Sequence, residues 1–260
     1  MNTNNNISKI KNNIQDKNSE AWKKLCEYVD LVAKKGKKEF SPREYLGDEL
    51  FAQIYTLPKS ISKLKKVKRV WLYGSKLKRI PPEIGQMKSL EYFDPYTSYD
   101  LKWFPYELTN CKKLKDSRIS TRALFGNFKN RKAFPKLDHN PVRYDNENLK
   151  CSVCEKQISY DTTNQLWITL RIGTDTVPLL ANLCSKECEN SLPHPPKDYV
   201  QYPHKGGADL VQQPDEIELL DLKIAEEEKA DKSTNQSIKK TLEGNSKPSL
   251  LKLVRKIWEQ

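Results

Sequence analysis

The stretch LPKSISKLKKVKRVWL (residues 57–72) sets a pattern that the sequence repeats twice, as IPPEIGQMKSLEYFDP (80–95) and FPYELTNCKKLKDSRI (104–119). The copies start at residues 57, 80 and 104, so they follow each other at steps of 23 and 24 residues. Positions 7, 10 and 13 after each start carry mostly apolar residues: Leu64, Met87 and Cys111, then Val67, Leu90 and Leu114, then Val70, Phe93 and Ser117. A unit of this size cannot bury its apolar edge alone, so the pattern predicts three stacked units, each with one short strand.

This spacing resembles leucine-rich repeats, in the intracellular and bacterial variant written LPxxIxxLxxLxxLxL, over residues 57–125. The resemblance implies a curved array with a concave parallel sheet. The position that forms an asparagine ladder in that family falls here on Ser75, Ser98 and Arg122. Serine can make a weaker form of that hydrogen bond. Pro95 occupies a core strand position without a backbone donor, so we expect a distorted second strand.

Helices are expected to cover the open start of this array. An apolar stripe at helical spacing predicts a helix from Ser19 to about Gly36, through Trp22, Leu25, Cys26, Val29 and Val32. A second helix is predicted from a capping box, with Ser41 as N-cap, Pro42 at the first position and Glu44 as its partner; Tyr45, Leu46, Leu50, Phe51 and Ile54 would face the core. Residues 120–128 would end the array.

Four cysteines are spaced for one metal ion. They occur as CSVC (151–154) and, after 29 residues, CSKEC (184–188). Two close pairs of thiolates can bind zinc tetrahedrally, and four protein ligands leave no open position, so we expect a structural site. Disulfides or free thiols, and an iron–sulfur or redox site, are the alternatives. Cys26 and Cys111 are expected to be buried free thiols.

The segment between the cysteine pairs predicts a hairpin. LWITLRI (166–172) alternates as a half-buried strand, GTDT turns, and VPLLANL (177–183) returns, with Pro178 best suited to a sheet edge. A helix should then place Cys188 one turn after Cys184. This order resembles a treble-clef zinc finger, and on that resemblance the ligands are Cys151, Cys154, Cys184 and Cys188. His194 or His204 is an alternative ligand, and the proline-rich segment 192–210 is expected to wrap the finger.

The predicted fold class is therefore α+β. We expect a disordered N-terminus (1–18), a helical cap with leucine-rich repeats (19–128), a linker (129–148), a zinc-binding module with four cysteine ligands (149–213) and a charged helical tail (214–260). In that tail, STNQS (233–237) should break an acidic helix, and a basic amphipathic helix should follow, with an apolar stripe of Leu250, Leu251, Val254, Ile257 and Trp258.

Composition favours a cytoplasmic protein. The 260 residues carry a net charge of +12, with 31% charged and 37% hydrophobic residues. Such a charge suits acidic partners, nucleic acid or an anionic surface, but scattered lysine is also typical of a solvated surface. The start MNTNNNISKI has no apolar signal region, and no run of 18 apolar residues occurs, which predicts the absence of a transmembrane segment. A polar, Asn-rich start also fits export by a specialised secretion system.

The expected function is non-enzymatic binding of a protein partner, because no catalytic motif is present. Alternation along the strands places seven residues on the concave face, as candidate partner-binding residues: Arg69, Trp71, Tyr73, Tyr92, Asp94, Tyr96 and Arg118. Asp94 and Arg118 are expected to pair. A segment of the same chain, such as the tail helix, is the alternative occupant. The alternative functions are nucleic-acid binding through the finger, and a bacterial secreted effector or toxin-neutralising protein. The sequence names neither the partner nor the oligomeric state.

Overall fold

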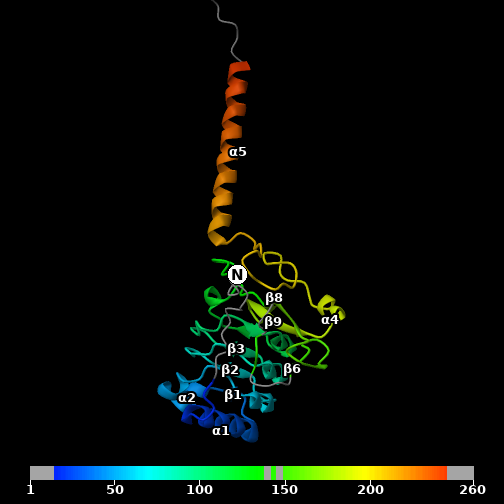
Figure 1. Ribbon diagram of the computed structural model, residues 1–260. Coiled ribbons are helices and arrows are strands. Elements are labelled where there is room, and N and C mark those ends of the chain that lie inside the picture. Colours follow the sequence, from blue (N-terminus) through cyan, green and yellow to red (C-terminus); the bar gives the residue numbers. More distant parts are fainter. Residues whose placement is uncertain (1–14, 138–141, 145–148, 245–260) are drawn as a thin grey trace, which may run out of the picture. The chain divides into compact units, whose positions relative to one another are not determined.

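The computed structural model describes residues 15–137, 142–144 and 149–244. The chain divides into two compact units, Met1–Gln213 and Pro214–Gln260, and each is described by itself below. The first unit combines helices with small sheets, so its class is α+β (Figure 1). Gln15, which we assigned to a disordered segment, is buried: its amide donates to Gln53 O at 3.1 Å and accepts from Tyr55 N at 2.7 Å.

The first sheet consists of four short parallel strands, in the order β1-β2-β3-β5 (Figure 1). They are β1 (Glu39–Phe40), β2 (Arg69–Trp71), β3 (Tyr92–Asp94) and β5 (Asp116–Ser117). Val70 pairs with Phe93, and Phe93 pairs with Ser117, so the strands keep the register of the sequence repeat. Strand β1 lies outside the repeat, and the sequence did not predict it.

A turn of 3₁₀-helix precedes each of β2, β3 and β5, and a fourth follows β5. These turns are η2 (Lys59–Lys63), η3 (Pro82–Gln86), η4 (Tyr106–Asn110) and η5 (Thr121–Ala123). η2 packs on η3, and η3 packs on η4. The residues pointing inward from strands and turns, such as Val70, Ile84 and Phe93, are buried in one core. Successive copies therefore bury their apolar edges against each other, as the stacking argument requires.

Serine hydroxyls link two of the turns that follow the strands. Ser75 Oγ lies 2.7 Å from Ser98 Oγ, and Ser98 Oγ donates to Leu72 O at 3.1 Å. Arg122, at the third ladder position, is exposed. Pro95 lies just after β3, so its missing N–H does not interrupt the strand. Backbone hydrogen bonding between the two copies continues beyond Pro95, where Gly74 N donates to Tyr96 O at 2.9 Å.

The helices before the repeat differ in part from the prediction. α1 (Glu20–Lys35) begins after Ser19, whose hydroxyl accepts from Trp22 N, and ends at Gly36 in the left-handed region (φ 59°). The predicted second helix is two short helices, α2 (Pro42–Leu46) and α3 (Asp48–Phe51). The predicted capping box is wrong, because the Ser41 side chain makes no capping hydrogen bond; Tyr45 is exposed and not in the core.

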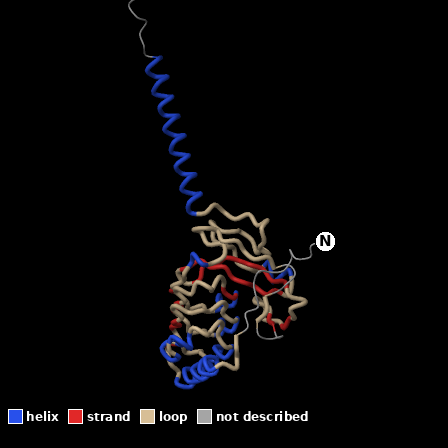
Figure 2. The backbone as a smooth tube through the Cα atoms, turned by 60° about the vertical axis from the view of Figure 1, so that its left-hand side comes forward, coloured by secondary structure: helices blue, strands red, loops and turns tan. Residues whose placement is uncertain are grey.

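The second sheet joins the repeat to the cysteine-bearing segment. The hairpin of β8 (Asn164–Ile172) and β9 (Asp175–Leu183) is antiparallel (Figure 2), and β4 (Phe104–Pro105), at the start of the third copy, pairs with β9 in parallel. The sheet order β4-β9-β8 makes β9 the central strand, so the edge placement of Pro178 is wrong. The pairing with β4 runs from Leu179 to Leu180, just past this proline. The half-buried character of β8 is also wrong, because Trp167 and Thr169 are as buried as their neighbours on the opposite face.

The turn of this hairpin covers the last strand of the parallel sheet. Ser117 Oγ, on β5, lies 2.9 Å from Ile172 O and 2.8 Å from Asp175 Oδ2, and it accepts from Thr174 N at 3.1 Å. Gly173 allows this approach: it has φ 58°, and a Cβ there would lie 2.8 Å from Ser117 Oγ. The sequence had assigned the end of the array to residues 120–128 alone.

The proline-rich segment continues around the hairpin. Trp167 N donates to His204 O at 2.8 Å, and His204 N donates back to Trp167 O at 3.0 Å. The Trp167 indole, completely buried, donates to Pro135 O at 2.9 Å and packs against Trp103 and Phe134. The residues assigned to a linker and to an arm thus share an aromatic core with β8.

The second unit contains α5 (Glu216–Gly244), a single continuous helix (Figure 1). The predicted break at STNQS is wrong. Ser233 and Thr234 hydroxyls donate to Ala230 O, and Ser237 donates to Ser233 O, at 2.9 to 3.0 Å. Hydroxyls that bond to the preceding turn in this way are compatible with a helix interior. The predicted basic helix near Leu250 lies outside the described residues. Among the described residues, no helix has the length and apolar character needed to cross a membrane.

Candidate metal centre

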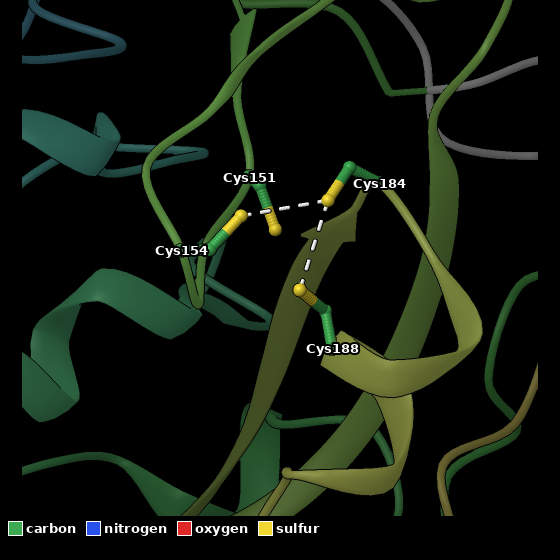
Figure 3. A group of neighbouring side chains, drawn as sticks. All are labelled: Cys151, Cys154, Cys184 and Cys188. Carbon is green, nitrogen blue, oxygen red and sulfur yellow. Dashed lines mark hydrogen bonds between the residues drawn. The ribbon is translucent and has the colours of Figure 1, made fainter.

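Four cysteines from three elements meet at the end of the hairpin (Figure 3). Cys151 and Cys154 lie on the turn between β6 (Leu149–Lys150) and β7 (Gln157–Ile158); Cys184 follows β9, and Cys188 lies on α4 (Lys186–Asn190). Their Sγ atoms all lie within 4.8 Å of one another. Cys184 Sγ is 3.5 Å from Cys154 Sγ and 3.6 Å from Cys188 Sγ. The two sequence pairs therefore form one cluster.

Backbone hydrogen bonds hold the turn that carries Cys151 and Cys154. Cys151 N donates to Lys156 O at 2.8 Å, and Glu155, at φ 60°, donates back to Cys151 O at 3.0 Å. Ser152 fastens this turn to β9, because its N–H donates to Asn182 O at 2.7 Å and its Oγ accepts from Asn182 N at 2.9 Å. On the other side, Ser185 caps α4 by accepting from Cys188 N at 3.3 Å. Both halves of the cluster are thus positioned by β9.

The geometry fits a metal ion better than disulfides. All four cysteines are free, and the sulfur separations of 3.5 and 3.6 Å far exceed a bond of about 2.05 Å. Tetrahedral zinc, with bonds of about 2.3 Å, places its sulfurs about 3.8 Å apart. The cluster therefore has the donor atoms and the spacing that can hold one metal ion.

The thiols of the cluster differ in their tendency to ionise. Desolvation opposes ionisation of Cys151, but backbone N–H groups of Cys154 and Val153 lower its pKa to about 7. The hydrogen bond with Cys154 raises the pKa of Cys184 to about 12. Four adjacent thiolates cannot coexist without a compensating charge, and a divalent ion supplies it.

The remaining candidate ligands lie elsewhere. His194 is exposed, whereas His204 is buried against Phe134, and its Nδ1 accepts from Gly206 N at 3.1 Å. Burial lowers the pKa of His204 to about 4, so it is neutral. Neither histidine belongs to the cluster that the described residues form. Cys26 is half-buried; Cys111 is buried, and burial raises its pKa to about 12.

The candidate partner-binding residues lie along the outer side of the parallel sheet. Trp71 packs on Tyr92 at 4.9 Å between ring centroids, and Tyr73 packs on Tyr96 at 6.1 Å. We call these four side chains the aromatic face. Tyr73 is 45% exposed, and Trp71, Tyr92 and Tyr96 are half-buried.

Polar residues border the aromatic face. Arg118 stacks over the Tyr96 ring at 4.3 Å and lies 3.9 Å from Asp94, as the predicted pair requires. Asp94 is only 2% exposed, contrary to its expected role as a contact residue. It accepts from Tyr92 OH at 3.2 Å and from Tyr96 N at 2.9 Å, so it positions the rings. At the other end, Glu39 lies 3.5 Å from Arg69 and accepts from the Trp71 indole at 3.2 Å.

A group of polar residues lies between the repeat and the cysteine turn, and the sequence patterns did not predict it. Glu83 and Glu107 stand at the same position of consecutive copies, three residues after each start, and this repetition is the signal that could have identified them. Ser152, between two cysteines, donates to Glu107 Oε1 at 2.7 Å. Tyr144, within the segment that was predicted to be a linker, was also given no role.

Comparisons with known proteins do not assign this chain to a family. No protein-family model matches it, and a search of curated proteins found no match. Its interpretation therefore depends on its own residues and their geometry.

Proposed function

We propose that this chain is a non-enzymatic interaction protein, in which a leucine-rich-repeat array presents the aromatic face to a protein partner and a structural zinc ion holds the hairpin in place. The observation that carries the proposal is the aromatic face itself. Stacked Trp and Tyr rings with an adjacent Arg are the residue types that dominate binding hot spots. Here Trp71 and Tyr92 lie in the adjacent strands β2 and β3, and Tyr73 and Tyr96 follow directly after these strands, where Gly74 N donates to Tyr96 O.

Zinc is the metal best suited to the cluster. Four thiolates in a closed tetrahedral set are typical of structural zinc sites, and they leave no position for a substrate. The ion would join the turn at Cys151 to α4 and so brace β9, whose hairpin turn covers β5 through Ser117. Free thiols also suit a reducing compartment, so we place the protein in the cytoplasm.

The basic charge supports a protein partner over nucleic acid. Between Ile61 and Arg79 the sequence has eight Lys or Arg and no acid, but several pair with carboxylates elsewhere. Lys63 lies 2.7 Å from Asp30, and Lys68 lies 2.8 Å from Glu91. Cations already paired in this way are less available to phosphates. Nucleic-acid binding stays the alternative outcome of the experiment below.

The experiment compares capture by three immobilised full-length proteins in a native lysate. They are the wild type, Tyr73→Ala combined with Tyr96→Ala, and the control Tyr202→Ala, which truncates an exposed tyrosine of the proline-rich segment. Trp71 is a poorer choice, because its indole also bonds Glu39. Truncating a hot-spot aromatic costs about 2 kcal/mol, which is about 30-fold in the dissociation constant.

We expect the wild type and the control to capture a specific protein that the double variant does not capture. Nuclease treatment and a change from about 50 to about 200 mM salt should leave that capture largely intact, because phosphate-driven binding falls steeply over this range. Equal capture by all three proteins, or capture abolished by nuclease, would exclude the aromatic face as the binding surface.

A further inference from the structure

The four cysteines of the metal centre differ in their access to solvent. Cys151 is 1% exposed and Cys188 is 8% exposed, so both are buried. Cys154 is exposed, and Cys184 is half-buried. The contact between the sulfurs of Cys154 and Cys184 lies at the surface, whereas the contact of Cys184 with Cys188 is partly buried. A reagent in solution therefore reaches Cys154 and Cys184 before the other two.

The two accessible sulfurs lie next to each other, and a dashed line joins them in Figure 3. Their separation of 3.5 Å exceeds the length of a disulfide bond by only about 1.5 Å. Cys154 lies in the turn between β6 and β7, and Cys184 lies between the end of β9 and the start of α4. Because neither residue is inside a strand or a helix, the two side chains can approach without displacing β9 or α4.

A disulfide between these two residues would connect the same segments that a metal ion connects. Cys154 belongs to the turn that Ser152 fastens to β9, and Cys184 is the first residue after β9. A bond between Cys151 and Cys154, or between Cys184 and Cys188, would instead close a loop within one segment. Closing a longer loop constrains the unfolded chain more. The bond across the 30 positions from Cys154 to Cys184 is therefore the one that can replace the ion as a brace.

We propose that Cys154 and Cys184 are a reversible redox pair: a hydroperoxide joins them in a disulfide, the metal ion is released, and the disulfide then holds the turn and β9 together in its place. The release of metal rests on the zinc site proposed above. The choice of the two sulfurs rests only on their exposure, their separation and the segments that carry them. The centre thus keeps the hairpin braced under both reducing and oxidising conditions.

The reaction balances with hydrogen peroxide as the oxidant. The Cys154 thiolate attacks one peroxide oxygen, the O–O bond breaks, and a sulfenic acid and a hydroxide ion form. The Cys184 thiolate then attacks the sulfenic sulfur, the S–O bond breaks as the S–S bond forms, and a second hydroxide leaves. The two sulfurs together lose two electrons, which reduce the peroxide. Cys151 and Cys188 remain as thiolates, and two sulfurs are too few to close a tetrahedral zinc site.

Disulfide mapping on the full-length chain tests the proposal. The reduced chain, with zinc and after chelation, receives increasing amounts of hydrogen peroxide; the remaining thiols are alkylated, the linked peptides are identified by mass spectrometry, and a zinc-sensitive dye measures release. We expect the Cys154–Cys184 link to form first and to account for most of the disulfide, with one zinc ion lost for each link. A thiol reductant with added zinc should restore the starting state.

Three results would contradict the proposal. They are a first link between Cys151 and Cys154, a first link between Cys184 and Cys188, and zinc that stays bound after the Cys154–Cys184 link has formed. A reduced chain that holds no zinc from the start would contradict the zinc site and, with it, the release of metal. The map of linked peptides from that same chain would still support or overturn the choice of sulfurs.

Matched variants separate the two cysteines of the turn. Cys154→Ser and Cys151→Ser each remove one sulfur of the cluster, but only the first should lose the link to Cys184. Cys26→Ser, outside the cluster, should behave as the wild type. The oxidised wild type, freed of metal, should also resist urea better than the reduced, chelated wild type. An equal yield of cross-link in Cys154→Ser, or no gain in urea resistance on oxidation, would overturn the proposal; the wild-type measurements decide it even where a variant does not fold.

Discussion

Replacing Glu107 with Gln should stabilise the protein at high pH and have little effect at low pH. Burial raises the pKa of this carboxyl from 4.5 to about 7, while the Ser152 hydroxyl partly offsets it. An acid whose pKa is higher in the folded state binds more protons when folded. Its favourable contribution is therefore complete below about pH 4.5 and is lost as the pH rises through 7.

The magnitude follows from the two pKa values. A folded pKa of about 7 against 4.5 makes ionisation about 3 kcal/mol more costly in the folded chain. Glutamine removes this cost, because it does not ionise, and its Oε1 can still accept from Ser152. At about pH 8 the variant should gain up to about 3 kcal/mol of unfolding free energy, and at about pH 5.5 the gain should fall to somewhat less than half of this.

Urea unfolding of both proteins at several pH values measures this difference. Protonation of the cysteines affects both proteins, so it cancels in the comparison. Glu91→Gln is a control for which the opposite sign is expected. The hydrogen bond from Lys68 lowers the pKa of Glu91, so losing this carboxylate should lower the unfolding free energy slightly at high pH. A Glu107→Gln protein less stable than wild type at about pH 8, or a difference that does not change with pH, would refute the reasoning.

Two further substitutions probe the packing that the structure depends on. Gly85→Ala should cost about 1–3 kcal/mol of unfolding free energy by overpacking, because the new Cβ meets the Glu107 carbonyl. Thermal unfolding should show a midpoint lower by several degrees. An unchanged midpoint would contradict the tight contact of η3 with η4. Ser117→Ala should cost about 1–3 kcal/mol of unfolding free energy, because Asp175 and the Thr174 N–H lose their hydrogen bonds to Ser117. Amide hydrogen exchange should then become faster in the hairpin turn and in β5 together. Unchanged exchange in β5 would show that the turn does not cover this strand.

Local patterns were sufficient where neighbouring residues decide the structure. The spacing of Val70, Phe93 and Ser117 predicted strands that lie in register, and Ser19 and Gly36 marked both ends of α1. The cysteine spacing likewise predicted one cluster, because a tight turn and a helical turn each fix a pair of sulfurs at close range. These features depend on contacts within a few residues or on exact repetition.

Contacts between distant segments decided the rest. Pro178 reads as an edge residue, but β4 from the repeat pairs with β9 just beyond it. Trp167 lies on the face of β8 that was expected to be exposed, and residues near Pro135 and His204 cover it. Asp94 looked exposed by alternation, yet the surrounding rings bury it. A cavity of about 740 Å³ lies where η3 and η4 meet the turn at Cys151. Because these segments are far apart in the sequence, no local pattern predicted it.

Zinc-edge X-ray absorption of the purified full-length chain, with the metal content of the same sample, tests the central claim most directly. The account predicts one zinc per chain with four sulfur neighbours at about 2.3 Å, lost in Cys184→Ser and retained in Cys26→Ser. A chain purified without metal whose four cysteines are joined in disulfides, or zinc surrounded mainly by nitrogen and oxygen, would contradict it.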